Sequence, residues 1–283
     1  MSNTSFASCF VAPPPDNNQD LVIYAGGDTR SNPPILEKSF KAILNDLKKS
    51  HYSSPTLFLH VGDWIDNGNK EQNWYQEFFA VDFPGIPLFL SQIPILGVRG
   101  NHDGNTELFK KYYPYNYASK EGIYYSQKFG PVEIIAIDQY VPLSEDSEQY
   151  RWLEKTLAQS KQKFKIAFFH APLWSAGGHI NEKEILQAQN DLHPLFIKYG
   201  VKLVLSGHNH YYSRSLVEGI HYLTVGTMGA PLMEPKKAFN QQKYFKGFHF
   251  CKISYFGGLW SNKIKIEIKD LDGKLIEEFS FSL

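Results

Sequence analysis

The feature that most constrains this chain is an apolar run that stops at a glycine and is followed at once by polar residues able to do chemistry. The clearest example is Ile95–Val98, which leads into Gly100-Asn101-His102-Asp103. In open α/β sheets, ligands bind beyond the carboxyl ends of the strands, so catalytic groups are expected in such a segment. Asn, Asp and Gly are also ordinary turn residues, so one example would not separate a site from a turn.

Four further predicted strands end in the same way. Residues 21–25, 56–61, 165–169 and 201–205 are short and apolar, with the β-branched and aromatic character of buried strands. A single Asp after a strand is usually a helix cap, but five such positions in one chain are hard to explain by capping. The residues at the five strand ends are, in order, Asp28, Asp63, Asn101 with His102, His170, and His208 with His210.

Segments with helical periodicity lie between these strands, which predicts βαβ units and an α/β fold. The chain after residue 214 has alternating, hairpin-like segments, and we expect these to form antiparallel strands that complete a second sheet. Another hairpin is predicted over residues 122–140, with Gly130-Pro131 as its turn. The predicted helices cover residues 35–49, 71–80, 108–117, 150–160 and 182–199.

Composition limits the organisation and the partners of the chain. With 283 residues and 42% hydrophobic content, the chain can form one large domain, predicted over residues 20–283, while the polar residues 1–19 are predicted to be a flexible arm. Lys plus Arg and Asp plus Glu both number 29, so no net charge attracts nucleic acid, and an anionic substrate must be held locally. No apolar run approaches the length of a membrane span. The oligomeric state and the cellular compartment, cytoplasmic or exported, stay undecided.

The residue types at the strand ends indicate a metal site. Carboxylate, imidazole and amide groups suit divalent Zn, Mn or Fe, and the two cysteines, Cys9 and Cys251, are not arranged as a thiolate site. The donors are too many for one ion. Two ions about 3.5–4 Å apart, bridged by a carboxylate, form a clamp for in-line displacement at phosphorus. We therefore expect two divalent metal ions as cofactors.

The motifs GD, GDxxD, GNHD, FFHAP and GHNH, in that order between Gly27 and His210, resemble the motif set of the calcineurin-like metallophosphoesterases. The flanking passages are similar to the bacterial branch related to purple acid phosphatases. The resemblance implies a four-layer sandwich of two mixed β-sheets flanked by helices. It also implies hydrolysis of a small phosphate mono- or diester by attack of a metal-bound hydroxide. The alternative is a catalytically weakened metal- or phosphate-binding module of the same fold.

The resemblance also assigns roles to individual residues. Asp63 is expected to bridge the two ions. His102 is expected to stand beside them and to donate a proton to the leaving oxygen or stabilise the phosphate, with Asp103 orienting its ring. The alternative for His102 is a metal ligand. The remaining ligands divide into a His170 position, formed by Asn101, His170 and His208, and a His210 position, formed by Asp28 and His210.

Two residues depart from the family pattern. Arg30 stands where the family usually has a metal-binding His, and Asp66 stands where purple acid phosphatases have a metal-binding Tyr. Three expectations follow: Asp66 binds the metal ion at this position, that ion is weakly held, or Asp66 only caps the next helix. Arg30 is expected to contact the substrate phosphate, to pair with Asp66 or another carboxylate, or to point to solvent, and we favour the phosphate contact.

Four residues just beyond the metal-binding motifs are candidates for contacting substrate. His179 lies in the loop after FFHAP, where related enzymes have a His. Trp174, Tyr211 and Tyr212 are weaker candidates, because each aromatic ring could equally serve packing.

Overall fold

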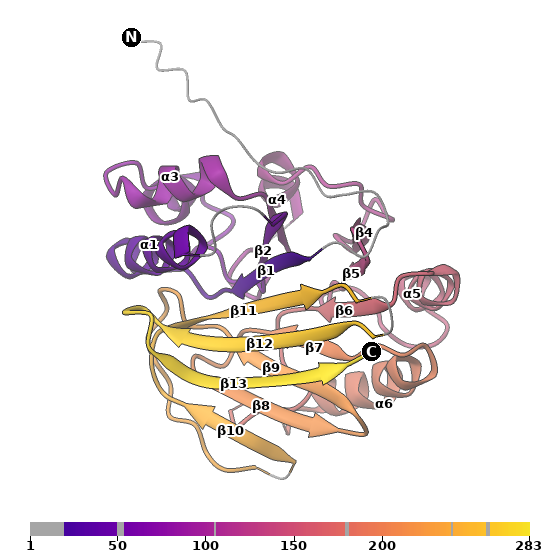
Figure 1. Cartoon of the computed structure of the whole chain (residues 1–283). Coiled ribbons are helices and arrows are strands. Elements are labelled where there is room, and N and C mark those ends of the chain that lie inside the picture. The colour runs from indigo at the N-terminus through magenta and orange to yellow at the C-terminus, as the bar shows by residue number, and fades with distance from the viewer. Residues whose placement is uncertain (1–19, 50–53, 105, 179–180, 239, 259–260) are drawn as a thin grey trace.

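Two mixed β-sheets lie face to face, and helices cover the outer face of each sheet (Figure 1). The structure is a computed structural model that describes residues 20–49, 54–104, 106–178, 181–238, 240–258 and 261–283. The predicted four-layer fold is confirmed. The predicted arm, residues 1–19, lies outside the described residues.

The first sheet has the strand order β13-β12-β11-β1-β2-β3. Its strands β1, β2 and β3 are parallel, and β11, β12 and β13 continue the sheet in antiparallel pairs. The bounds are β1 Leu21–Gly26, β2 Thr56–His60, β3 Ile95–Gly97, β11 His249–Phe256, β12 Lys263–Asp270 and β13 Leu275–Ser282.

The second sheet has the strand order β10-β8-β9-β7-β6-β5-β4. Its centre, from β5 through β6 and β7 to β9, is parallel, and antiparallel pairs with β4 and β8 flank that centre. The bounds are β4 Tyr125–Phe129, β5 Val132–Ala136, β6 Phe164–Phe168, β7 Leu203–Ser206, β8 Tyr212–Val217, β9 Ile220–Val225 and β10 Gln241–Phe245.

Three apolar clusters separate the four layers. One lies between the sheets, one lies under the helices of the first sheet, and one lies under α5 and α6 on the second sheet. No helix in the described part of the chain is long and apolar enough to cross a bilayer. The helices are α1 Pro33–Lys49, α2 Glu71–Asn73, α3 Gly85–Gln92, α4 Thr106–Tyr112, α5 Glu148–Gln159 and α6 Lys183–Lys198.

The destination of the C-terminal strands differs from the prediction. Strands β8, β9 and β10 belong to the second sheet as expected, but β11, β12 and β13 return to the first sheet, where β11 pairs with β1. Alternating polarity predicts that a segment is a half-buried strand, but it does not say which sheet edge the strand joins. The prediction that all of these strands complete a second sheet is therefore wrong.

Local structure also differs from prediction between β2 and β3. The helix predicted over residues 71–80 is a short α-helix followed by a π-helical segment, η1 Trp74–Phe78, and α3 was not predicted. Segments of π-helix are rare and carry no simple sequence signal. Helix α3 is short and apolar, so its periodicity does not distinguish a helix from a buried strand.

A partly buried carboxylate connects the helical layer to the first sheet. Asp46 on α1 accepts hydrogen bonds from Tyr24 at 2.7 Å, Lys252 at 2.8 Å and Lys269 at 2.6 Å. Burial alone would raise the pKa of Asp46, but the two ammonium groups hold it below its usual value. The carboxylate therefore stays charged and joins α1 to β1, β11 and β12.

Asp46→Ala should lower the free energy of unfolding by about 2–4 kcal/mol, because two largely buried ammonium groups and a hydroxyl lose their shared acceptor. Urea denaturation measures the change. The matched control is Asp272→Ala, which removes an exposed ion pair with Lys38 and should cost less than about 0.5 kcal/mol. Equal, small changes in both variants would contradict the assigned role of Asp46.

Candidate metal centre

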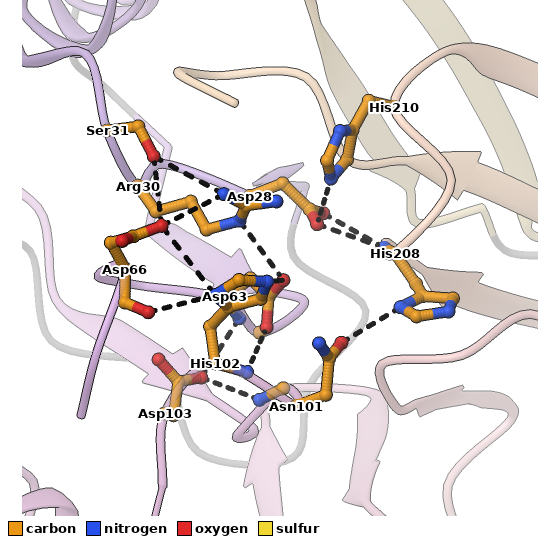
Figure 2. Close-up of polar contacts among 12 residues, drawn as sticks. Asp28, Arg30, Ser31, Asp63, Asp66, Asn101, His102, Asp103, His208 and His210 are labelled. Carbon is orange, nitrogen blue, oxygen red and sulfur yellow. Dashed lines mark hydrogen bonds and ion pairs between the residues drawn. The ribbon is translucent and has the colours of Figure 1, made fainter. Parts of the chain in front are cut away.

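The five predicted strand ends meet at one place. Strands β1, β2 and β3 of the first sheet and β6 and β7 of the second are each followed by one of the loops that carry the candidate residues. Backbone hydrogen bonds join these loops, from Asp28 N to Gly62 O at 2.9 Å and from Gly207 N to His170 O at 2.8 Å. Figure 2 shows Asp28, Asp63, Asn101, His208 and His210 facing one another across the centre.

The donors of the His170 position surround a common point. Asn101 Oδ1 lies 3.1 Å from His170 Nε2 and 3.0 Å from His208 Nδ1, and the two ring nitrogens are 3.3 Å apart. His170 Nε2 is also 3.3 Å from Asp63 Oδ1. Lone-pair donors that face one another at such distances are arranged as ligands around a cation.

Backbone carbonyls fix the tautomers of two of the imidazoles. His170 Nδ1 donates to Val61 O at 2.9 Å, and His210 Nδ1 donates to Pro231 O at 2.7 Å. In each neutral ring, Nε2 therefore carries the lone pair, because metal-binding histidines commonly donate their other ring N–H to a backbone carbonyl. His210 Nε2 is buried without a hydrogen bond and lies 3.3 Å from Asp28 Oδ1.

The central donors can share the ligand sphere of one ion. One ligand atom from each of Asp28, Asp63 and His170 lies within 4.8 Å of the others, and all three residues are buried. Ligands at about 2.0–2.3 Å from a metal are separated by distances of this order. The donor chemistry and spacing therefore fit a divalent cation.

Charge and burial shift the pKa values of these groups in opposite directions. Burial alone would lower the pKa of His170, but the carboxylates of Asp63 and Asp28 raise it to about 9. Burial raises the pKa of Asp28. Burial would also raise the pKa of Asp63, but contacts with His170 and His102 together lower it. The carboxylates therefore favour positive charge at the middle of the centre.

Two glycines of the motifs are required because carboxylates of neighbouring loops lie close to their Cα atoms. A Cβ atom at Gly100 would lie 2.1 Å from Asp63 Oδ1, and one at Gly207 would lie 2.3 Å from Asp28 Oδ2. Both aspartates have positive φ, 51° at Asp28 and 53° at Asp63, which is uncommon for residues other than glycine. The tightly turned loops aim the two carboxylates into the site.

His102 and Asp103 lie side by side in sequence but make different contacts. His102 Nδ1 donates to Asp66 O at 2.9 Å, and His102 Nε2 is 4.0 Å from Asp63 Oδ2. Asp103 is fully buried and accepts from the backbone N–H groups of Asp63 at 2.9 Å, Trp64 at 2.8 Å and Gly100 at 2.6 Å. The expectation that Asp103 orients the His102 ring is therefore corrected, because the Asp66 carbonyl holds that ring. Burial and the nearby Asp63 carboxylate raise the pKa of Asp103 to about 8.

Arg30 and Asp66 contact each other. Arg30 Nη1 lies 3.1 Å from Asp66 Oδ1, and Arg30 Nε lies 3.5 Å from Asp63 Oδ2 (Figure 2). Of the three expected placements of Arg30, the structure has the carboxylate pairing. Asp66 Oδ1 also accepts from Ser31 Oγ at 3.3 Å, so this oxygen is engaged by the loop after β1.

A chain of buried hydrogen bonds that supports the site was not predicted from the sequence. Gly62 N–H donates to His60 Nδ1 at 3.2 Å, so His60 Nε2 carries the proton and donates to Thr29 Oγ1 at 3.1 Å. The Thr29 hydroxyl then donates to Trp64 O at 2.9 Å. Burial lowers the pKa of His60 well below its usual value, so the ring stays neutral. The available signal was a His just before VGD, in a strand that is otherwise apolar.

The three aromatic candidates, Trp174, Tyr211 and Tyr212, make packing contacts away from the proposed ligands. His179 lies outside the described residues. Tyr211 and Tyr212 are fully buried, with hydroxyls bonded to Gly177 O at 2.9 Å and Glu277 Oε2 at 2.6 Å. The ring of Trp174 packs on His193, with centroids 4.7 Å apart. These three aromatic residues serve packing.

Comparison with known proteins identifies the family. A model of the family described as calcineurin-like phosphoesterase matches residues 14–212, which is more than half of the 283-residue chain. The chain therefore belongs to the calcineurin-like phosphoesterase family, and the resemblance inferred from the motifs is confirmed.

Several of the similar proteins are purple acid phosphatases. Purple acid phosphatase 15 of Arabidopsis thaliana is 26% identical in a match that covers 58% of this chain and 36% of the relative. Probable purple acid phosphatase 20 of the same plant is 29% identical in a match that covers 61% of this chain and 45% of the relative. The chain thus spans less than half the length of either relative.

A solved structure of a purple acid phosphatase from yellow lupin seeds matches 96% of this chain and 55% of its own, with a TM-score of 0.83 and 20% identity. At this identity the likeness concerns the fold.

Asp103→Asn should lower the melting temperature. It should also lower the affinity for divalent metal by about 10–100-fold, the usual effect of changing a residue that orients metal ligands. Both oxygens of Asp103 accept from backbone N–H groups, whereas the NH2 group of an asparagine can only donate. One of these hydrogen bonds is therefore lost, and with it a connection between the loops of Asp63 and Gly100. Calorimetry and titration with Zn²⁺ measure the two effects. Wild-type metal affinity in the variant would show that Asp103 does not position the site.

Proposed function

We propose that the chain is a metal-dependent hydrolase of phosphate esters. The observation that carries the proposal is the convergence of Asp28, Asp63, Asn101, His170 and His208 from five strand ends within contact distance of one another. Family membership supports the reaction class, and the donor types support Zn, Mn or Fe as the metal.

The donors are assigned to two positions around Asp63. Asn101, His170 and His208 form the His170 position, Asp28 and His210 form the His210 position, and Asp63 faces both. Divalent cations at such a centre, when bound, lower the pKa of water and offset negative charge on the transferring phosphoryl group. The protein contributes fixed lone pairs, since the Val61 and Pro231 carbonyls hold the His170 and His210 rings in the required tautomer.

His102 is assigned the proton transfer to the leaving oxygen. Its Nδ1–H group is engaged by the Asp66 carbonyl, which leaves Nε2 to face the centre beside Asp63. Protonation of Nε2 gives an N–H group able to donate to a departing alkoxide. Partial exposure of the ring allows Nε2 to exchange protons with solvent.

The substrate is a small phosphate ester. The chain has no net charge, so the positive groups that hold an anion are those of the centre itself. Monoesters and diesters use the same centre. A panel of aryl phosphate, bis-aryl phosphate, cyclic nucleotide and phospholipid head-group diester separates these classes.

Removal of metal with a chelator should abolish turnover of aryl phosphate, and addition of Zn²⁺, Mn²⁺ or Fe²⁺ should restore it. His170→Ala should bind metal at least about 10-fold more weakly and should not recover fully, because a buried donor is lost. Chromogenic release and elemental analysis measure both results. Tightly bound metal without turnover of any ester in the panel would favour the catalytically weakened binding module instead.

His102→Ala should keep the wild-type metal content and lower kcat by about 10²–10⁴-fold, the usual contribution of a positioned acid. Steady-state kinetics and elemental analysis of the same preparation measure the two quantities. Loss of a metal ion in this variant would make His102 a ligand rather than the acid.

A further inference from the structure

The two metal positions differ in the donors available to them. At the His170 position, Asn101 Oδ1 and two imidazole nitrogens lie within 3.3 Å of one another, and Asp63 Oδ1 is 3.3 Å from His170 Nε2. At the His210 position, the close donors are Asp28 and His210, 3.3 Å apart. The second position therefore depends on the other oxygen of Asp63, or on Asp66, for further ligands.

Arg30 engages both of those carboxylates. Its Nε atom lies 3.5 Å from Asp63 Oδ2, and its Nη1 atom lies 3.1 Å from Asp66 Oδ1. The two oxygens of Asp63 thus face different partners, with Oδ1 toward His170 and Oδ2 toward the guanidinium.

The guanidinium is held in place by its loop. Thr29 N donates to Asp63 O at 2.9 Å, and Ser31 N donates to Glu77 Oε2 at 2.7 Å, so both neighbours of Arg30 are fixed. Glu77 also accepts from Asp66 N at 3.0 Å, which joins the Arg30 and Asp66 loops. The Arg30 side chain is only 15% exposed, so moving it aside would require breaking contacts of the loop.

From this geometry we propose that Arg30 takes the place of a second metal ion. The centre then holds one divalent cation tightly, at the His170 position, and the guanidinium supplies the fixed positive charge beside Asp63 Oδ2. A guanidinium stays protonated and binds no metal, and a dication at the His210 position would be repelled by it. The inference rests on the metal centre proposed above and concerns how many ions that centre holds.

Arg30 can also contact substrate in this arrangement. Its Nε atom is buried and makes no hydrogen bond, although it is near Asp63. A phosphate oxygen that enters between the His170 position and Arg30 would meet a cation on one side and an N–H donor on the other. Phosphate recognition would thus need one metal ion and one side chain.

The test is metal stoichiometry in the full chain, stripped with a chelator and refilled with Mn²⁺ or Zn²⁺ alone. Equilibrium dialysis with elemental analysis should give one tightly bound ion per wild-type chain and two per Arg30→His chain. Electron paramagnetic resonance of the Mn²⁺ forms gives a second readout. Wild type should show an isolated ion, and Arg30→His should show the exchange-coupled signal of two ions that share a carboxylate.

Three variants sharpen the test. Arg30→Lys keeps the positive charge and should still bind one ion per chain. Arg30→Met removes the charge and should raise the affinity for a second ion by about 10-fold or more. Arg214→His, at an arginine that pairs with Glu277 in the second sheet, should stay at one ion. If Arg30→His does not fold, Arg30→Met still tests the proposal.

Two ions bound with similar affinity in wild type would overturn this inference and leave the proposed hydrolase intact. Absence of any tight ion in wild type would overturn both. One ion in both Arg30→His and Arg30→Met would show that Arg30 does not exclude the second ion.

Discussion

One buried carboxylate, Asp103, determines how the loops after β2 and β3 lie relative to each other. Its two oxygens accept from backbone N–H groups on both loops and so hold the segments of Asp63 and Asn101 together. Three buried donors would be left unsatisfied without it, at a cost of about 1–3 kcal/mol each. The residue that most firmly positions the ligands is thus not itself a ligand in our assignment.

The ligands are also held in uncommon backbone conformations. Asp28, Asp63 and His208 all have positive φ, and each follows a glycine. The glycine before Asp63 leaves room for the His170 ring, and the glycine before His208 leaves room for the Asp28 carboxylate. Such conformations persist only where surrounding contacts enforce them. Here two sheets, packed through a continuous apolar core, supply those contacts from both sides.

Much of this arrangement could be predicted from the sequence. The recurrence of an apolar run, a glycine and a donor predicted the strand ends and the residues gathered there, because parallel strands deliver their carboxyl ends to one edge. The roles that depend on a side chain's direction could not be predicted in this way. Asp103 and His102 are adjacent, yet one points to backbone amides and the other to the Asp66 carbonyl. The pairing of Arg30 with Asp63 and Asp66, and the return of β11 to β1, depend on contacts between distant segments.

The return of β11 has a consequence for synthesis of the chain on the ribosome. Leu21 pairs with Tyr255, so one edge of β1 stays open until nearly the whole polypeptide has emerged. The segment between β9 and β10 is also synthesised late. It binds the loop of Asp28 through Ala230 N, which donates to Asp28 O at 2.8 Å. Pairing over such a separation in sequence slows folding and exposes a strand edge in the meantime. The residues matched by the family model, 14–212, therefore lack β11, β12 and β13, the three strands that complete the first sheet, and a nascent chain of that length would need protection from aggregation.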